Sequence, residues 1–326
     1  MKASGNTGET MNTHLICLTI DTDPDGLSAQ VTDRNSSTFK SLEALYSLPD
    51  KLNESLGMAV PLTWFIRIDN QIRHLFGTHL YLLEHYAGFW EKVSAMGHEL
   101  AWHPHLYEQD GSGNFHLHSS IDGALTEFAE VLQSIRKHKP DLRSFRNGEA
   151  WHHPELFKLV EAAGFQNDAT VIAGRIVPDN PLKHWEHAPQ HPYYPAHDDL
   201  TRPGTKRQLL ELPISTWITK ASYDSSHKRR YFNPAIHPAI FQKAIADNRK
   251  FLLEQIHPLR VWNFISHPDD IINHDNPNDL LYSRSADAYI QNLKAFVDML
   301  KEEDKEVIFC TVDRAATLWR KAYENH

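Results

Sequence analysis

Two imidazoles lie one residue apart at the end of a short apolar run, where His103 and His105 close the segment 97–105. Two carboxylates, Asp21 and Asp23, end another apolar run far upstream. Imidazole and carboxylate together are typical ligands of a catalytic zinc ion. Because parallel strands of an α/β sheet end at one face, two motifs that are distant in the sequence can form one site there.

The acidic segment could also be an ordinary solvated turn. Asp21, Asp23 and Asp25 lie close together beside proline and glycine, a composition that is common in loops after strands. Three neighbouring carboxylates repel one another unless a cation or an arginine compensates their charge. The two histidines and Arg146 can supply a metal site and this counter-charge, so we favour the chemical interpretation.

Short apolar runs rich in branched or aromatic residues alternate with helical patterns along the chain. The predicted strands are 14–20, 60–66, 99–102, 143–145, 166–171, 208–214, 260–266 and 306–311. The helices between them show a period near 3.6, and Pro154 marks the first turn of one of them. Short connections between about seven or eight parallel strands predict an α/β fold, either a barrel or a large open sheet.

Two segments carry no regular pattern. The segment 174–207 contains six prolines, and a second irregular segment spans 222–238. Long ordered loops in a compact domain are often functional. We therefore interpret both as walls of a substrate cleft, with a plain surface excursion as the alternative.

Composition narrows the classes of protein. The chain has 326 residues, of which 41% are hydrophobic, which is enough for a large core. Its two cysteines, Cys17 and Cys310, lie inside apolar runs, so we expect core packing and a reducing, cytoplasmic location. Residues 1–12 are polar and lack the apolar core of a signal peptide, so we expect a disordered tail there.

Charge and hydropathy argue against two further classes of partner. The formal net charge is −9 at pH 7, which disfavours general nucleic-acid binding. No segment approaches the roughly 18 uninterrupted apolar residues of a transmembrane helix. We therefore expect neither a nucleic-acid partner nor a membrane span.

Five short motifs, taken in order, resemble those of the polysaccharide deacetylase family. They occupy 18–23, 97–103, 145–146, 210–213 and 265–268, and the resemblance extends over most of the chain, roughly 15–318. The members of this family are metal-dependent carbohydrate esterases that remove acyl groups from N-acylated sugars. The resemblance implies a distorted (β/α) barrel and one catalytic domain over 13–326, with 174–207 as an irregular insertion and long active-site loops.

The resemblance also implies a role for each site residue. Asp21 corresponds to the general base, and Asp23 and His103 correspond to metal ligands. Arg146 would orient Asp21, and His267 would be the general acid. The expected cofactor is a divalent metal, most often zinc, with cobalt, manganese or iron as alternatives.

The chain departs from the family pattern at two positions. The family has a further histidine ligand four residues after the first, but that position is Tyr107 here. Either His105 replaces it through a different loop shape, or the site binds metal weakly. The proline that follows the family's arginine is also absent, and Asn147 follows Arg146 instead.

Three functions remain compatible with these residues. The first is removal of an acetyl or formyl group from an N-acylated sugar or sugar precursor in surface polysaccharide metabolism. The second is hydrolysis of a non-sugar amide, as in allantoinase-like relatives, and the third is a catalytically weakened carbohydrate-binding protein. A two-histidine, one-carboxylate iron oxygenase fits the ligand types, but the repeated βα pattern argues against it.

Several further polar residues have structural interpretations that we prefer. We expect hydrogen bonding for His98 and Glu99, and a supporting position rather than catalysis for Glu211. The pair His152 and His153 could line the cleft, but capping of the following helix is at least as good an explanation.

Overall fold

The structure is a computed structural model that describes residues 12–26, 39–139, 141–254, 259–273 and 279–323. The predicted tail, 1–12, lies outside the described residues except for Asn12. No helix in the described ranges is long and apolar enough to cross a membrane.

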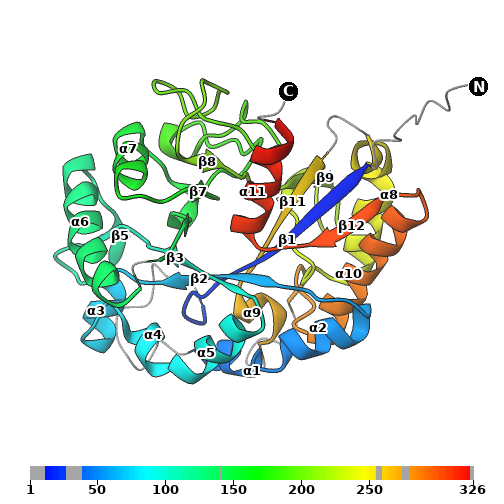
Figure 1. Ribbon diagram of the computed structural model, residues 1–326, viewed down its shortest axis with the longest axis horizontal. Helices are drawn as coiled ribbons and strands as arrows, with labels where there is room; N and C mark the ends of the chain where they lie inside the picture. The colour runs from blue at the N-terminus through cyan, green and yellow to red at the C-terminus, as the bar shows by residue number, and fades with distance from the viewer. Residues whose placement is uncertain (1–11, 27–38, 140, 255–258, 274–278, 324–326) are drawn as a thin grey trace, which may run out of the picture.

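A curled parallel sheet forms the centre of the molecule (Figure 1). Its strands, in spatial order, are β11 (Leu259–Ser266), β1 (Thr13–Asp21), β2 (Leu62–Arg67), β3 (Glu99–His103), β6 (Ser144–Phe145), β7 (Asn167–Asp168) and β8 (Leu210–Glu211). The strand β12 (Glu306–Phe309) pairs with the first half of β1, beside β2. These are the eight predicted strands, so the α/β prediction is confirmed.

The two ends of the sheet are joined by hydrogen bonds, which makes it a distorted β/α barrel. The amide of Ser215, beyond β8, donates to the carbonyl oxygen of Asn263 in β11 at 3.0 Å. The side-chain amide of Asn263 donates to the carbonyl oxygen of Leu212 at 2.8 Å. Isolated contacts of this kind, rather than a continuous ladder, close the barrel.

Helices surround the sheet on its outer side (Figure 1). They are α1 (Lys40–Ala44), α2 (Leu48–Leu56), α3 (Asn70–Phe76), α4 (Tyr81–His85), α5 (Ala87–Ala95), α6 (Ile121–His138), α7 (Pro154–Ala162), α8 (Pro238–Leu253), α9 (Pro268–Ile271) and α10 (Ala286–Lys301). The predicted first-turn proline is confirmed, because Pro154 begins α7 and the imidazole of His153 accepts a hydrogen bond from the amide of Glu155. His153 is therefore a helix cap.

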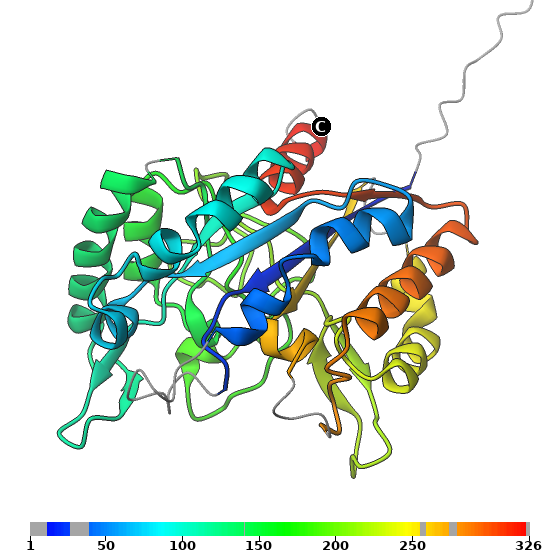
Figure 2. The ribbon, with the colours of Figure 1, turned by 90° about the horizontal axis from the view of Figure 1, so that it is seen from below.

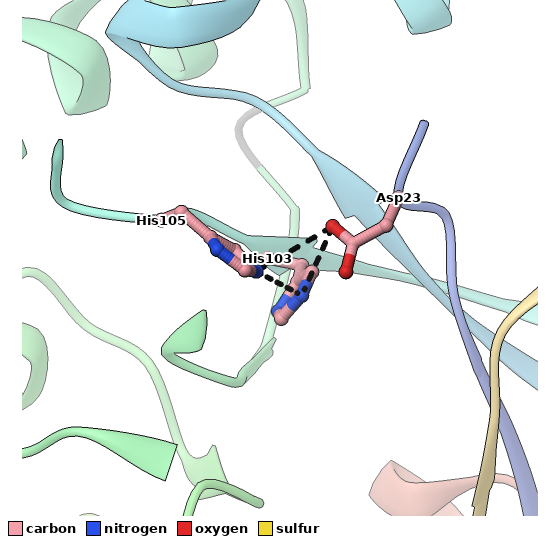
Figure 3. A group of neighbouring side chains, drawn as sticks. All are labelled: Asp23, His103 and His105. Carbon is pink, nitrogen blue, oxygen red and sulfur yellow. Dashed lines mark hydrogen bonds and ion pairs between the residues drawn. The ribbon is translucent and has the colours of Figure 1, made fainter. Parts of the chain in front are cut away.

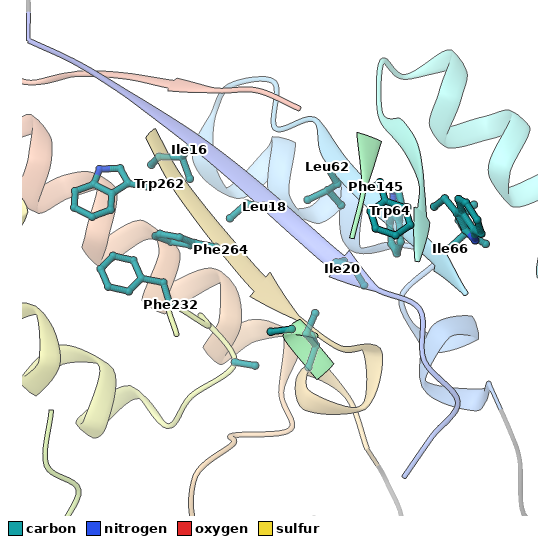
Figure 4. Close-up of a cluster of buried hydrophobic side chains, with 14 of the residues drawn as sticks. Ile16, Leu18, Ile20, Leu62, Trp64, Ile66, Phe145, Phe232, Trp262 and Phe264 are labelled. Carbon is teal, nitrogen blue, oxygen red and sulfur yellow. The ribbon is translucent and has the colours of Figure 1, made fainter. Parts of the chain in front are cut away.

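Side chains of the strands alternate between the two faces of the sheet, and this alternation positions the site. In β1, Ile16, Leu18 and Ile20 pack outward in the large core (Figure 4). Leu15 and Cys17 belong to a second core cluster inside the barrel. The inner-facing positions continue at every second residue as far as Asp21, which lies at the carboxyl end of the strand.

A terminal helix closes the opposite end of the barrel. The helix α11 (Val312–Tyr323) contributes Ala315, Ala316 and Trp319 to the inner cluster, together with Cys17 and Cys310. Both cysteines are buried and unpaired, so the predicted core packing is confirmed. Because the amino-terminal end is filled, the open space of the barrel lies at the carboxyl ends of the strands.

Two β-hairpins lie outside the predicted set of strands. They are β4 (Tyr107–Gln109) with β5 (Phe115–Leu117), and β9 (Thr216–Thr219) with β10 (Lys228–Tyr231). Figure 2 shows them extending beyond the sheet on the side toward which β1 runs. The prediction of an irregular segment over 222–238 was therefore wrong in part, because β10 lies within it. The proline-rich segment 174–207 is irregular as predicted, with the single-turn 3-10 helix η3 (Pro181–Lys183) and isolated bridges.

Candidate active site

A cavity of about 770 Å³ opens at the carboxyl ends of the strands. All six residues that the sequence singled out line it, namely Asp21, Asp23, His103, His105, Arg146 and His267. They reach the same space because they lie on or just beyond different strands of one sheet, with side chains on its inner face. The structure therefore brings together motifs that are up to hundreds of residues apart in the chain.

Asp23, His103 and His105 form a group that could hold a metal ion (Figure 3). The Nε2 atoms of the two histidines are 3.2 Å apart. The Oδ1 atom of Asp23 lies 3.4 Å from Nε2 of His105 and 3.7 Å from Nε2 of His103. His105, rather than the residue at the family position, is thus the second histidine of the group.

Hydrogen bonds on the far side of each ring determine which nitrogen carries the proton. Nδ1 of His103 donates to the carbonyl oxygen of Arg146 at 2.8 Å. Nδ1 of His105 donates to the hydroxyl of Tyr107 at 2.9 Å, since that hydroxyl itself donates to Glu149. Both Nε2 atoms are left with lone pairs that face each other without a proton between them. Two such lone pairs and a carboxylate oxygen fit a divalent cation.

A buried arginine that the sequence analysis missed also contacts this group. Nη1 of Arg67 donates to Oδ1 of Asp23 at 2.6 Å, and Arg67 is paired with Asp69 as well. Burial alone would raise the pKa of Asp23, but His105 and Arg67 outweigh it and hold this pKa well below its usual range. Arg67 therefore competes with a cation for the same oxygen. The sequence could have revealed Arg67, because it lies two residues after Phe65 and side chains of a strand alternate between the two faces of the sheet.

The carboxylate of Asp21 is held by Arg146. Nη1 of Arg146 donates to Oδ1 of Asp21 at 2.6 Å and to the hydroxyl of Thr19 at 2.8 Å. Nε of Arg146 donates to the carbonyl oxygen of Ala169 at 2.8 Å. The other oxygen of Asp21 lies 3.6 Å from Nε2 of His103. One oxygen is therefore fixed, and the second faces the metal-ligand group.

His267 presents one ring nitrogen to the cavity and the other to a carboxylate. Its Nδ1 lies 3.1 Å from Oδ2 of Asp270, and its Nε2 lies 3.7 Å from Oδ2 of Asp23. Burial would lower the pKa of His267, but Asp270 together with Asp23 and Asp21 raises it to about 10. A cation bound at the neighbouring ligand group would oppose a positive charge on this imidazole. Asp270 was not predicted, although it lies three residues beyond His267 at the start of α9.

Backbone geometry explains how His105 reaches the group. A Cβ atom on Gly148 would lie 2.1 Å from Cδ2 of His105, so only glycine allows the ring to lie against this backbone. The amide of His105 also donates to Asp69 at 2.9 Å. Glu149 and Ala150, which follow Gly148 in the chain, both have positive φ angles. This backbone conformation costs about 1–3 kcal/mol per residue and is found at functional sites.

Replacing Tyr107 with phenylalanine is expected to weaken metal binding by about 10- to 100-fold, the range for loss of a partner that orients a ligand. The substitution removes the acceptor for Nδ1 of His105 and the donor to Glu149. Metal titration of the purified variant measures the effect. Tyr86→Phe is the matched control, since that hydroxyl donates to Glu43 in another part of the chain. Equal affinity in Tyr107→Phe and wild type would contradict this role.

Other candidate residues lie outside the cavity. His98 accepts a hydrogen bond from the amide of Leu62 at 3.1 Å, so its predicted structural role is confirmed. His152 is buried and bonded to Asp168 at 2.6 Å. Glu211, also fully buried, accepts from the amide of Val171 at 3.0 Å, and burial beside Asp168 raises its pKa well above the usual range.

No family model matches the chain, and no curated protein sequence matches it. Solved structures do resemble it. One from Parabacteroides distasonis, named for a glycoside hydrolase or deacetylase, has a TM-score of 0.59 at 15% identity and covers 97% of this chain and 73% of its own. The Puue allantoinase has a TM-score of 0.54 at 12% identity, and the match covers 97% of this chain and 93% of the allantoinase. A structure named as a probable polysaccharide deacetylase from Pseudomonas aeruginosa PAO1 has a TM-score of 0.53 at 13% identity, and the match covers 96% of this chain and 93% of that one. The chain therefore has the distorted-barrel fold of the solved polysaccharide deacetylases and of an allantoinase.

Proposed function

We propose that this protein is a metal-dependent hydrolase that removes an acetyl or formyl group from the nitrogen of a sugar or sugar precursor. The observation that carries the proposal is the convergence of three kinds of group in one cavity. These are the lone-pair donors of Asp23, His103 and His105, the arginine-held carboxylate of Asp21, and the imidazole of His267 that Asp270 orients.

Asp23, His103 and His105 would hold a divalent cation, which would supply Lewis acidity toward the amide carbonyl and make water more acidic. The carboxylate of Asp21 takes a proton from the attacking water, while Arg146 keeps its other oxygen in place. The imidazole of His267 gives its proton to the leaving nitrogen as the C–N bond breaks. Asp270 keeps the ring oriented through Nδ1, so that Nε2 faces the substrate. The products are a carboxylic acid and a free amine.

The test is hydrolysis of N-acetyl and N-formyl sugars by the full chain after reconstitution with zinc, cobalt, manganese or iron. We expect acetate or formate release that depends on metal and that falls strongly in His267→Ala. A matched control is His184→Ala, since that imidazole accepts a hydrogen bond from Val177 away from the cavity lining. Metal-independent release, or full activity in His267→Ala, would contradict the proposal.

The fold shared with an allantoinase supports a second candidate, hydrolysis of a non-sugar amide. Allantoin in the same assay separates the two, because release of its ring-opened product without turnover of any N-acyl sugar would favour this candidate. Sugar binding without hydrolysis of either substrate would favour the carbohydrate-binding alternative.

A further inference from the structure

A second part of the cavity lining is rich in positive charge. Arg175, Lys228 and Arg229 line the cavity that also holds Asp21 and the three candidate ligands. Lys228 and Arg229 belong to the strand β10, and Arg175 follows Gly174. This concentration of positive charge is notable in a chain whose formal net charge is −9.

Arg175 and Arg229 form no ion pair with a carboxylate in the part of the chain that the structure describes. Nη1 of Arg175 donates to the backbone oxygen of Glu149 at 2.7 Å, and Nη1 of Arg229 donates to the hydroxyl of Thr216 at 2.9 Å. Arg230, by contrast, is bound to Asp224 through both carboxylate oxygens at 2.9 Å. Arg175 is half-buried, and desolvation lowers its pKa, with Glu149 opposing the change, whereas Arg229 is exposed on β10. Each guanidinium has N–H groups beyond those used in the hydrogen bonds above, so an anion could accept from both.

The backbone is shaped to bring Arg229 to this place. A Cβ atom on Gly174 would lie 2.6 Å from Cζ of Arg229, and Gly174 has φ of +76°. Thr216, which accepts from Arg229, donates in turn to the carbonyl oxygen of Ala173 at 2.7 Å. Arg229 thus connects the hairpin of β9 and β10 to the segment that follows Ile172, and Arg175 lies in that segment.

We propose that Arg175 and Arg229 form an anion subsite, so that the substrate of this cavity carries a phosphate or carboxylate group in addition to its amide. The proposal rests on the proposed function for the position of the amide. Guanidinium groups bind both anions through paired N–H donors, so the shared chemistry is a fixed oxyanion. Lys228, which also lines the cavity, would add a further positive charge.

Equilibrium binding tests the subsite separately from catalysis. Calorimetry would compare three probes on the full chain after chelation: N-acetylglucosamine, its 1-phosphate, and N-acetylmuramic acid, which carries a carboxylate. Removing the metal prevents turnover and direct phosphate coordination. We expect at least one anionic probe to bind about tenfold more tightly than the neutral sugar, in keeping with charge-assisted hydrogen bonds. Preference for the phosphate alone would assign a phosphate ester, and preference for the carboxylate alone would assign a sugar acid.

Variants locate the effect. Arg175→Gln and Arg229→Gln should each abolish most of the preference, and Arg229→Lys should keep part of it through its charge. Arg249→Gln is the control, because Arg249 is an exposed arginine paired with Glu303. Equal affinity for all three probes, or a preference that survives in Arg175→Gln and Arg229→Gln, would overturn the subsite. If the metal-reconstituted wild type hydrolyses no N-acyl sugar but the chelated protein still prefers an anionic probe, that result would count against the proposed function and not against the subsite.

Discussion

Replacing Asp21 with asparagine is expected to lower kcat for amide hydrolysis by about 10³-fold, within the roughly 10²- to 10⁴-fold range of general acid–base catalysis. The amide retains an oxygen for the hydrogen bond from Arg146 but cannot take a proton from water. Steady-state kinetics on the zinc-reconstituted protein would measure kcat and KM. Because the substrate contacts are kept, the loss should appear in kcat rather than in KM.

Metal content distinguishes loss of the base from loss of the site. Asp21 lies 3.6 Å from Nε2 of His103, close to the ligand group but not a member of it, so Asp21→Asn should keep its metal. Asp50→Asn is the matched control, since Asp50 is exposed and paired with Lys92. A kcat in Asp21→Asn within a few-fold of wild type would exclude Asp21 as the base.

The sheet was predictable because buried parallel strands have a strong local signal. The long strands β1, β2 and β11 are runs rich in branched or aromatic residues, and helical patterns separate the predicted strands. The hairpin strand β10 has no such signal, because Lys228 to Tyr231 reads as three charges and a tyrosine. Its pairing with β9 depends on contacts between strands that the local pattern does not contain.

The core of the candidate site was predictable for a related reason. Asp21, His103 and His267 all follow apolar runs, and alternation places such residues on the inner face of the sheet. Arg67 follows the same rule in β2, but the predicted strand was ended one residue too early to include it. Glu149 could not be found in this way, because its position depends on a backbone conformation with positive φ.

The choice between His105 and Tyr107 shows what only three-dimensional geometry decides. Spacing alone left open whether His105 could replace the family's histidine. The ring reaches the group because Gly148 leaves room beside it, and Tyr107 takes a supporting position behind it. At this departure from the family pattern, His105 lies in the candidate ligand group and Tyr107 forms a hydrogen bond to it from behind.

Replacing His103 with alanine is expected to abolish metal binding, from about one ion per wild-type chain to almost none. His103 supplies one of three donors, and a two-donor site is far from the coordination that divalent cations require. Elemental analysis after reconstitution and dialysis would measure the content. Loss of metal should also remove metal-linked stability, which is about 2.7 kcal/mol at a hundredfold excess over Kd.

Thermal unfolding provides an independent readout of the same variant. Chelation should lower Tm of the wild type by about 5 °C, whereas Tm of His103→Ala should be the same with and without chelator. His116→Ala is the control, since its side chain is 47% exposed on β5 and lies beside Glu108. A variant that keeps one ion per chain would exclude His103 as a ligand. A wild-type chain that takes up no metal would contradict the metal site itself. The positive charge that neutralises Asp23 would then be that of Arg67.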